Sequence, residues 1–196
     1  MAIELRKGQK ISLRKEAAPV GEMSFNLNWD MITKKGLLFT STKSVDLDLG
    51  CLYELKNGRK GTVQALGNAF GRLEDAPYIK LDGDDRSGTN TNGETIRVNM
   101  AKLSEIQRIL VFTFIYQGTA QWAGTNARVT IKSPGNDDVL VQMDEYSTSK
   151  RMCALVLLEN DGNDNFQLSK AVSFFNGHRE MDEAFHWGLR WVAGSK

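Results

Sequence analysis

The stretch Glu22-Met-Ser-Phe-Asn-Leu-Asn-Trp29 decides the fold class, because its residues alternate between apolar and polar. In an extended strand, successive side chains point to opposite faces, so the apolar residues share one face and the serine and asparagines share the other. This alternation is typical of a half-buried strand in an antiparallel sheet. We therefore expect further strands on either side of it.

Similar alternation returns in two pairs of segments that are each joined by a turn. Residues 127–132 and 139–143 flank the cluster Ser133-Pro-Gly-Asn-Asp-Asp138, and residues 152–159 and 166–175 flank Asn160-Asp-Gly-Asn-Asp-Asn165. Asparagine, aspartate and glycine favour turns. Both pairs therefore predict β-hairpins.

The remaining signals also favour strands. Residues 109–116 are apolar except for Thr113, which indicates a central buried strand. Helical signals are confined to one turn near 102–107 and a terminal helix near 179–187. Residues 67–76 have no countable period, so we expect them to be the least ordered part of the chain. The sequence thus predicts an all-β fold, an antiparallel β-sandwich of two packed sheets with one or two short helices.

Composition limits the possible classes of protein. The 196 residues are 41% hydrophobic, which is enough for one sizeable core, so we expect a single sandwich domain over residues 1–196. A net charge of +1 argues against a general nucleic-acid binder. No apolar run is long enough to span a membrane, and the polar N-terminus lacks a secretory signal, so we expect a cytoplasmic protein.

Two acidic segments carry the strongest functional signal. In Val45-Asp-Leu-Asp-Leu-Gly-Cys-Leu-Tyr53, alternation places Asp46 and Asp48 on the face opposite Cys51. Two like charges side by side indicate either a solvated edge or a cation between them and another acidic segment. Both alternatives remain open from this segment alone.

The second segment, Asp82-Gly-Asp-Asp-Arg-Ser-Gly-Thr-Asn-Thr-Asn-Gly-Glu94, has the oxygen density that Ca²⁺ prefers. In EF-hand register from Gly83 the match fails, because position 1 is a glycine and the flanking residues favour strands over helices. The segment is therefore a strand–acidic loop–strand unit. It is either a calcium loop or an ordinary solvent-facing turn.

The chain resembles the TerD/TerA-like tellurium-resistance and stress-response family along nearly its whole length. The motifs that carry the resemblance, in order, are Leu5-Arg-Lys-Gly-Gln-Lys-Ile-Ser-Leu13, Leu27-Asn-Trp-Asp30, Asp46-Leu-Asp-Leu-Gly-Cys51, Gly83-Asp-Asp-Arg-Ser-Gly88, Gly93-Glu-Thr-Ile96 and Arg108-Ile-Leu-Val-Phe-Thr-Phe-Ile-Tyr116. The C-terminal third is more similar to the TerA branch. The resemblance implies a calcium-binding β-sandwich with no enzymatic activity, acting with other proteins of a bacterial resistance system.

The resemblance also implies a set of metal ligands. It consists of Asp46, Asp48, Asp84, Asp85 and Glu94, and we expect Asn92 or loop carbonyl oxygens to complete the shell. Asn92-Gly93 stands where the family usually has two aspartates, so we expect one weak calcium site rather than two. The alternative is a metal-independent module that binds partner proteins of the same system through a sandwich face or its basic N-terminal edge.

Other chemistry finds little support in the sequence. Cys51 and Cys153 lie in apolar runs and are expected to be buried free thiols. His178, Asp182 and His186 are spaced four residues apart, so one helix face could present them to a metal, but we expect an ordinary surface face. No nucleophilic triad, Walker loop or dinucleotide-binding motif is present, and we expect no enzyme.

Overall fold

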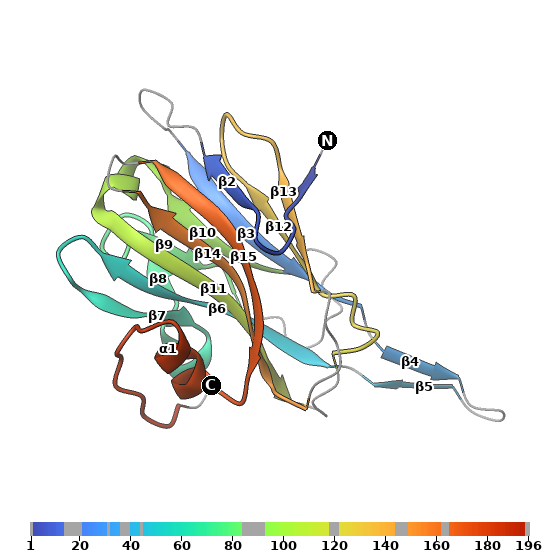
Figure 1. The fold of residues 1–196 in the computed structure, drawn as a ribbon. Helices are drawn as coiled ribbons and strands as arrows, with labels where there is room; N and C mark the ends of the chain where they lie inside the picture. The colour runs from blue at the N-terminus through green and yellow to red at the C-terminus, as the bar shows by residue number, and fades with distance from the viewer. Residues whose placement is uncertain are drawn as a thin grey trace.

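Two β-sheets pack face to face in the computed structural model (Figure 1). The structure describes residues 2–13, 21–30, 32–35, 40–43, 45–83, 93–117, 122–143, 149–161 and 165–194, and it describes only the backbone of 32–35 and 40–43. The predicted β-sandwich is confirmed. The expected single domain stays a prediction.

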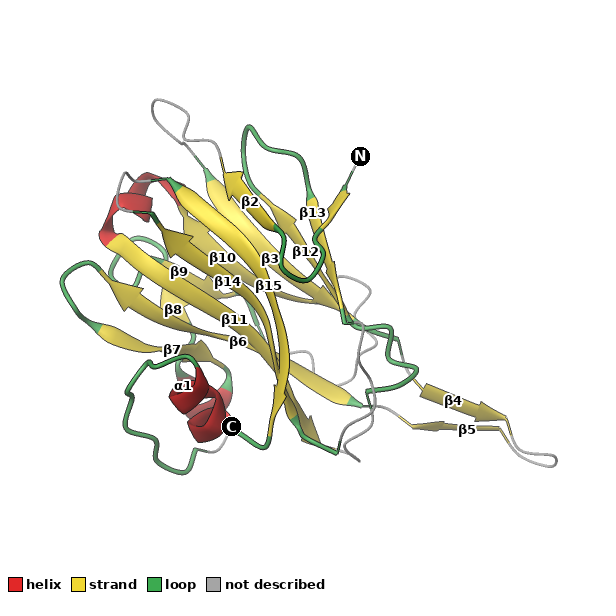
Figure 2. Ribbon diagram, viewed as in Figure 1, coloured by secondary structure: helices red, strands yellow, loops and turns green. Residues whose placement is uncertain are grey.

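The strands divide between the two sheets as follows (Figure 2). Sheet A has the order β1 (Ile3–Glu4), β13 (Val139–Gln142), β12 (Arg128–Lys132), β3 (Glu22–Asn28), β10 (Glu94–Asn99), β9 (Ile79–Leu81) and β8 (Gly71–Arg72). Sheet B has the order β2 (Lys10–Leu13), β15 (Phe166–Phe175), β14 (Met152–Asn160), β11 (Ile106–Gln117), β6 (Asp46–Leu55) and β7 (Lys60–Gln64). A separate hairpin of β4 (Ile32–Lys35) and β5 (Thr40–Lys43) projects from the sandwich (Figure 1).

Among the described strands, one pairing departs from the antiparallel pattern that we expected. β1 runs parallel to β13, with Ile3 opposite Val139. The two predicted hairpins are present as β12–β13 and β14–β15. The N-terminal β2 is an edge strand of sheet B.

Helices are short and lie at the ends of strands. There are 3₁₀ helices at Leu66–Asn68 and Met100–Glu105, and α1 spans His178–Ala184. Residues 67–76, expected to be the least ordered part, instead include β8, which pairs with β9. That expectation was wrong because a two-residue strand is too short to show a period.

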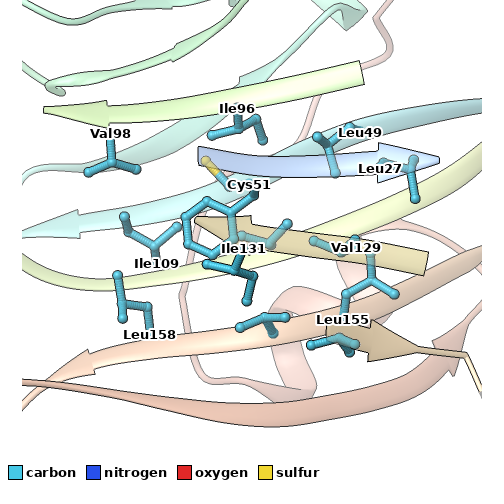
Figure 3. Packing of buried hydrophobic residues seen from close by; sticks show 14 of the residues in the cluster. Leu27, Leu49, Cys51, Ile96, Val98, Ile109, Val129, Ile131, Leu155 and Leu158 are labelled. Atoms are coloured by element: carbon cyan, nitrogen blue, oxygen red, sulfur yellow. The ribbon is translucent and has the colours of Figure 1, made fainter. Parts of the chain in front are cut away.

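The main core fills the space between the sheets. Alternating residues of β3, β6, β10 and β12 point into it, including Leu27, Leu49, Ile96 and Val129 (Figure 3). Each fully buried side chain of this size contributes roughly 1.5–3 kcal/mol to folding. The alternation read from the sequence therefore places these side chains correctly.

A second apolar cluster covers the outer face of sheet B. Leu52 of β6 and three residues of β11, Leu110, Phe112 and Phe114, pack there against residues 176–194, which we call the C-terminal segment. Since β11 also sends Ile109 and Val111 into the main core, it is buried on both faces. The apolar run 109–116 predicted such a central strand.

Polar contacts hold the C-terminal segment in place. The guanidinium of Arg108 donates to the carbonyl oxygens of Phe185 and His186, each at 3.1 Å, and lies 3.8 Å from the centre of the Trp187 ring. Trp187 Nε1 donates to the Tyr53 carbonyl at 3.1 Å. The segment is thus a layer packed on sheet B, and its helix α1 lies beside β7 (Figure 1).

Candidate metal centre

Strand β6 positions Asp46 and Asp48 on the outer face of sheet B. Leu47, Leu49 and Cys51 point into the main core, so the residues between them point the other way. Asp48 lies opposite Phe114 of β11, and Asp46 lies opposite Gln117. The predicted alternation of this strand is confirmed.

Both aspartates are buried. The exposed fraction of Asp46 is 6% and that of Asp48 is 0%, so a solvated edge, one of the two alternatives from sequence, is wrong. Both residues make other contacts, but Oδ1 of Asp46 and Oδ2 of Asp48 accept no hydrogen bond among the described residues. Burying a carboxylate is costly unless hydrogen bonds or a positive charge compensate it.

Glu94 approaches the same strand from sheet A. It begins β10 and points inward, in phase with Ile96 and Val98, and its exposed fraction is 3%. Its Oε2 accepts a hydrogen bond from the Leu49 amide at 2.7 Å. The pairing of β7 with β6 ends at Gly50, so this carboxylate takes the place of a strand partner for Leu49.

Gly93 allows Glu94 to make this approach. Its φ is +64°, and a Cβ at this position would lie 1.9 Å from the Leu27 carbonyl oxygen. Only glycine fits such a position without strain. The glycine that replaces a usual acidic residue of the resembled family is therefore required by the backbone of this chain.

The two ends of the acidic loop are fixed. The Asp82 amide donates to the Thr95 carbonyl at 3.0 Å, so the loop closes at the end of the β9–β10 ladder. The Asp82 carboxylate accepts from Arg97 Nε at 2.5 Å and, as the largest cause, raises the pKa of Arg97. Asp84, Asp85 and Asn92, three of the six predicted ligands, lie outside the described residues.

The residues that are described do not complete a metal site by themselves. Among them, no group of three histidine, cysteine, aspartate or glutamate side chains lies close enough to hold a metal ion. The structure does bring the Glu94 carboxylate into contact with the amide of Leu49, the residue that follows Asp48. The predicted ligand set as a whole therefore stays a prediction.

The cysteines are buried free thiols, as expected. Cys51 and Cys153 have no exposed surface. Burial raises the pKa of Cys51 to about 12, so this thiol stays protonated at neutral pH. Cys51 also points into the core, on the opposite side of β6 from the aspartates, and supplies no sulfur ligand to them.

The expectation of an ordinary surface face for His178, Asp182 and His186 is wrong for two of the three. Asp182 is buried, and its carboxylate accepts from the amides of Gly188 and Leu189 and from Trp191 Nε1. It holds the chain in its turn after α1. The sequence spacing alone gave no sign of these three donors.

His178 is packed in an aromatic environment. Its ring centre lies 5.4 Å from that of Phe112, 5.2 Å from Phe114 and 4.7 Å from Trp191. Nε2 is 2.8 Å from Gln64 Oε1, and burial lowers the pKa of the imidazole to about 4. His178 is therefore a neutral structural residue at neutral pH.

Within the described residues, no helix is long and apolar enough to cross a bilayer. This agrees with the absence of a long apolar run in the sequence.

Comparison with known proteins identifies relatives of this chain. The sequence profile of the TerD domain matches residues 1–159. The tellurium resistance protein TerA of an Alcaligenes species is 39% identical over 199 residues, covering 95% of this chain and 58% of that protein. The tellurium resistance protein TerZ of Serratia marcescens is 34% identical over 116 residues, covering 57% of this chain and 58% of that protein. The chain thus spans 58% of the length of each of these relatives.

Solved structures share the fold. The crystal structure of SAV2460, a protein of unknown function, has a TM-score of 0.61 and 13% identity, covering 84% of this chain and 95% of that chain. A homologue of the telluride resistance protein TerD from Streptomyces coelicolor has a TM-score of 0.59 and 16% identity, covering 83% and 95%. At these identities the likeness concerns the fold alone.

Proposed function

The chain belongs to the TerD domain family, and on that premise we propose that it is a non-enzymatic calcium-binding protein of a bacterial tellurium-resistance and stress-response system. The observation that carries the proposal is the burial of Asp46 and Asp48 on the outer face of β6, at the strand edge where Glu94 reaches the Leu49 amide from the core side. Like charges held out of water repel one another strongly, and a bound cation offsets that repulsion.

The acidic loop is long enough to supply the remaining ligands. Nine residues, 84–92, separate the two described ends, and Glu94 lies 2.7 Å from the Leu49 amide. An extended chain advances at most about 3.5 Å per residue, so a loop of this length folding back on itself reaches roughly 15 Å. In the proposed site, Asp84, Asp85 and Asn92 complete a shell begun by β6 and Glu94.

The donor chemistry fits Ca²⁺. Every proposed ligand presents oxygen, and Ca²⁺ accepts six to eight oxygens in irregular geometry. Gly93 carries no side chain and Asn92 no charge, which leaves the site with fewer anionic ligands than the family pattern. We therefore propose one site of weak affinity, because ligand charge tunes the affinity of such sites.

Calorimetric titration of chelator-treated protein with Ca²⁺ tests the proposal. The wild type is expected to bind one ion, and Asp48→Asn is expected to weaken binding at least tenfold. Asp75→Asn is the matched control, because Asp75 is an exposed aspartate whose side chain pairs only with Arg72 at the surface. Melting of all three proteins without metal separates a binding defect from a folding defect.

A second candidate function is a metal-independent module that binds other proteins of the resistance system. It is favoured by the lack, among the described residues, of three ligands close enough to hold a metal. If the wild type takes up no Ca²⁺ at millimolar concentration, this second function replaces the first.

A further inference from the structure

Strand β7 is the last described strand of sheet B, and among the described residues its outer edge is paired only at Gln64, which bridges to Ala69. It pairs with β6 on one side and is last in the strand order. A hollow of about 470 Å³ follows it, with Lys60, Thr62 and Gln64 on one side and residues 189–194 of the C-terminal segment on the other. We call this hollow the β7 groove.

The main-chain groups of β7 alternate in direction. The Gln64 amide donates to the Ala69 carbonyl at 2.9 Å and therefore points away from β6, whereas the Arg59 carbonyl accepts from Leu55 and points toward it. In an antiparallel strand, the main-chain N–H and C=O groups of successive residues point alternately to the two sides. The main-chain groups of Lys60 and Thr62, like those of Gln64, therefore point away from β6. Over the part of the chain that the structure describes, no main-chain hydrogen bond outside the strand ladders involves either residue.

The opposite wall of the groove contacts β7 through Lys60, whose Nζ donates to the Trp187 carbonyl at 3.0 Å, but among the described residues it makes no main-chain pair with the strand. Residues 187–194 have no regular secondary structure. The side chain of Trp191 is held by Asp182, and His178 is held by Gln64, so the aromatic floor is already fixed. Val192, which lines the groove, is 88% exposed.

The charge along this edge is positive. Lys60 and Arg190 line the β7 groove, and Arg59 and Arg72 line a second hollow of about 510 Å³ that shares Ala69 with it. Among the described residues, no acidic side chain lines either hollow, although Glu54 offsets Lys60 and Asp75 offsets Arg72. An acidic segment therefore complements this edge, and a basic one does not.

We propose that the β7 edge binds an extended acidic segment of a partner protein by strand addition. The outward main-chain groups of Lys60 and Thr62 would hydrogen-bond the added strand, and the side chains of the groove would select it. Gln64 is already bridged to Ala69, so the open edge is residues 60–62, which at about 3.3 Å per residue span roughly 7 Å and pair with about three partner residues. This interaction goes beyond calcium binding and does not require it.

The probe is a pool of fluorescein-labelled octapeptides that alternate glutamate with valine, isoleucine or threonine. We expect micromolar binding by fluorescence anisotropy, and NMR shifts at the Lys60 and Thr62 amides of the isotope-labelled protein. The same peptides with lysine in place of glutamate should bind at least tenfold more weakly. Absence of binding up to millimolar peptide, or equal binding of both pools, overturns the proposal.

Substitutions distinguish the edge from the surrounding surface. Thr62→Pro removes an outward amide, as edge strands tolerate, and should abolish binding, whereas Thr62→Val keeps the amide and should bind normally. Arg190→Glu should weaken binding of the acidic peptides at least tenfold. Arg179→Glu, an exposed arginine of α1 that does not line the groove, should not.

Two further measurements complete the test. Sedimentation of the free protein should show no self-association. If the wild type forms a dimer and Thr62→Pro does not, the β7 edge binds a second copy of this chain, and the proposal of an acidic partner is wrong. Calcium titration of Thr62→Pro should match that of the wild type. Loss of peptide binding and loss of calcium binding are therefore measured separately.

Discussion

At the scale of single residues, Gly93 shows how backbone geometry restricts the composition of the acidic loop. Its positive φ and the closeness of the Leu27 carbonyl leave no room for a side chain. We predict that Gly93→Ala lowers the free energy of unfolding by about 3 kcal/mol, measured by urea denaturation.

Gly83→Ala is the matched control at the other end of the loop. A Cβ there has no heavy atom of the described residues within 4 Å, and the φ of Gly83 lies outside the left-handed range. We expect it to change the free energy of unfolding by less than about 0.5 kcal/mol. Equal effects of the two substitutions would show that the contact with Leu27 does not limit position 93.

His178 gives a prediction about pH. Burial holds its pKa near 4 in the folded protein, below the 6.5 of a free imidazole. Between these values the unfolded chain binds more protons, so stability falls as the pH drops from about 6.5 to 4 and is fully present above that window. The loss attributable to His178 is on the order of 3 kcal/mol.

The other histidine supplies the comparison. His178→Phe should flatten the pH dependence of the melting temperature between pH 6.5 and 4, because no imidazole then needs to stay neutral in the aromatic cluster. His186→Gln, at the exposed second histidine, is measured beside it, so that removal of the buried ring is compared with removal of an exposed one. An unchanged slope in His178→Phe would mean that His178 does not titrate in this window.

At the scale of elements, the C-terminal segment packs on the outer face of sheet B, although it lies beyond the residues that match the TerD profile. Trp187 is fully buried, and its indole contacts Arg108 and the Tyr53 carbonyl. We predict that Trp187→Ala lowers the free energy of unfolding by about 3–5 kcal/mol, as for other large-to-small core substitutions.

The exposed neighbour Val192 provides the control for this prediction. Val192→Ala should alter the free energy of unfolding by less than about 0.5 kcal/mol. Loss of the C-terminal layer in Trp187→Ala should also uncover Leu52, Leu110 and Phe112, which increased binding of an apolar dye would detect. Wild-type stability and dye binding in Trp187→Ala would show that the segment is only loosely attached.

Strands were predictable where the alternation was local and long. Residues 22–28 and the hairpins β12–β13 and β14–β15 follow the pattern read from the sequence. β1 and β8 have two residues each, too few for a period, and the parallel pairing of β1 depends on a contact distant in the sequence.

The candidate site was predictable only in part, for the same reason. Alternation in β6 gave the direction of Asp46 and Asp48, but their burial depends on what packs over that face. The inward direction of Glu94 was available from its phase with Ile96 and Val98, whereas its hydrogen bond to Leu49 depends on how the two sheets pack. The face of a strand on which a residue lies can be read from its neighbours in the sequence. The residue that it contacts in the other sheet cannot.

At the scale of the whole molecule, the proposed calcium site draws ligands from both sheets. β6 belongs to sheet B, whereas Glu94 begins β10 of sheet A, and the acidic segment joins β9 to β10 in the sequence. The hydrogen bond from Leu49 to Glu94 already joins the sheets at this point. An ion held there would oppose separation of the sheets and so stabilise the complete sandwich rather than one loop.

This leads to a prediction about metal selectivity that melting curves can measure. A ligand that binds only the folded state stabilises it by RT ln(1 + [L]/Kd), about 2.7 kcal/mol at a hundredfold excess over Kd. For a chain of this length each kcal/mol raises the melting temperature by roughly 2–4 °C, so such an excess of Ca²⁺ should raise it by about 5–10 °C. Mg²⁺ requires near-ideal octahedral geometry and gives up its waters reluctantly, so we expect at least tenfold weaker binding.

At the same concentration, Mg²⁺ would then be in no more than about a tenfold excess and would contribute at most about 1.4 kcal/mol, half the stabilisation by Ca²⁺. Asp48→Asn should remove most of the Ca²⁺ shift, and Asp75→Asn should keep it. Zn²⁺ should give no specific shift, because it prefers nitrogen and sulfur ligands and the Cys51 thiol is protonated and faces the core. Equal melting-temperature shifts with Ca²⁺ and Mg²⁺, or a larger shift with Zn²⁺, would contradict the proposed all-oxygen calcium site.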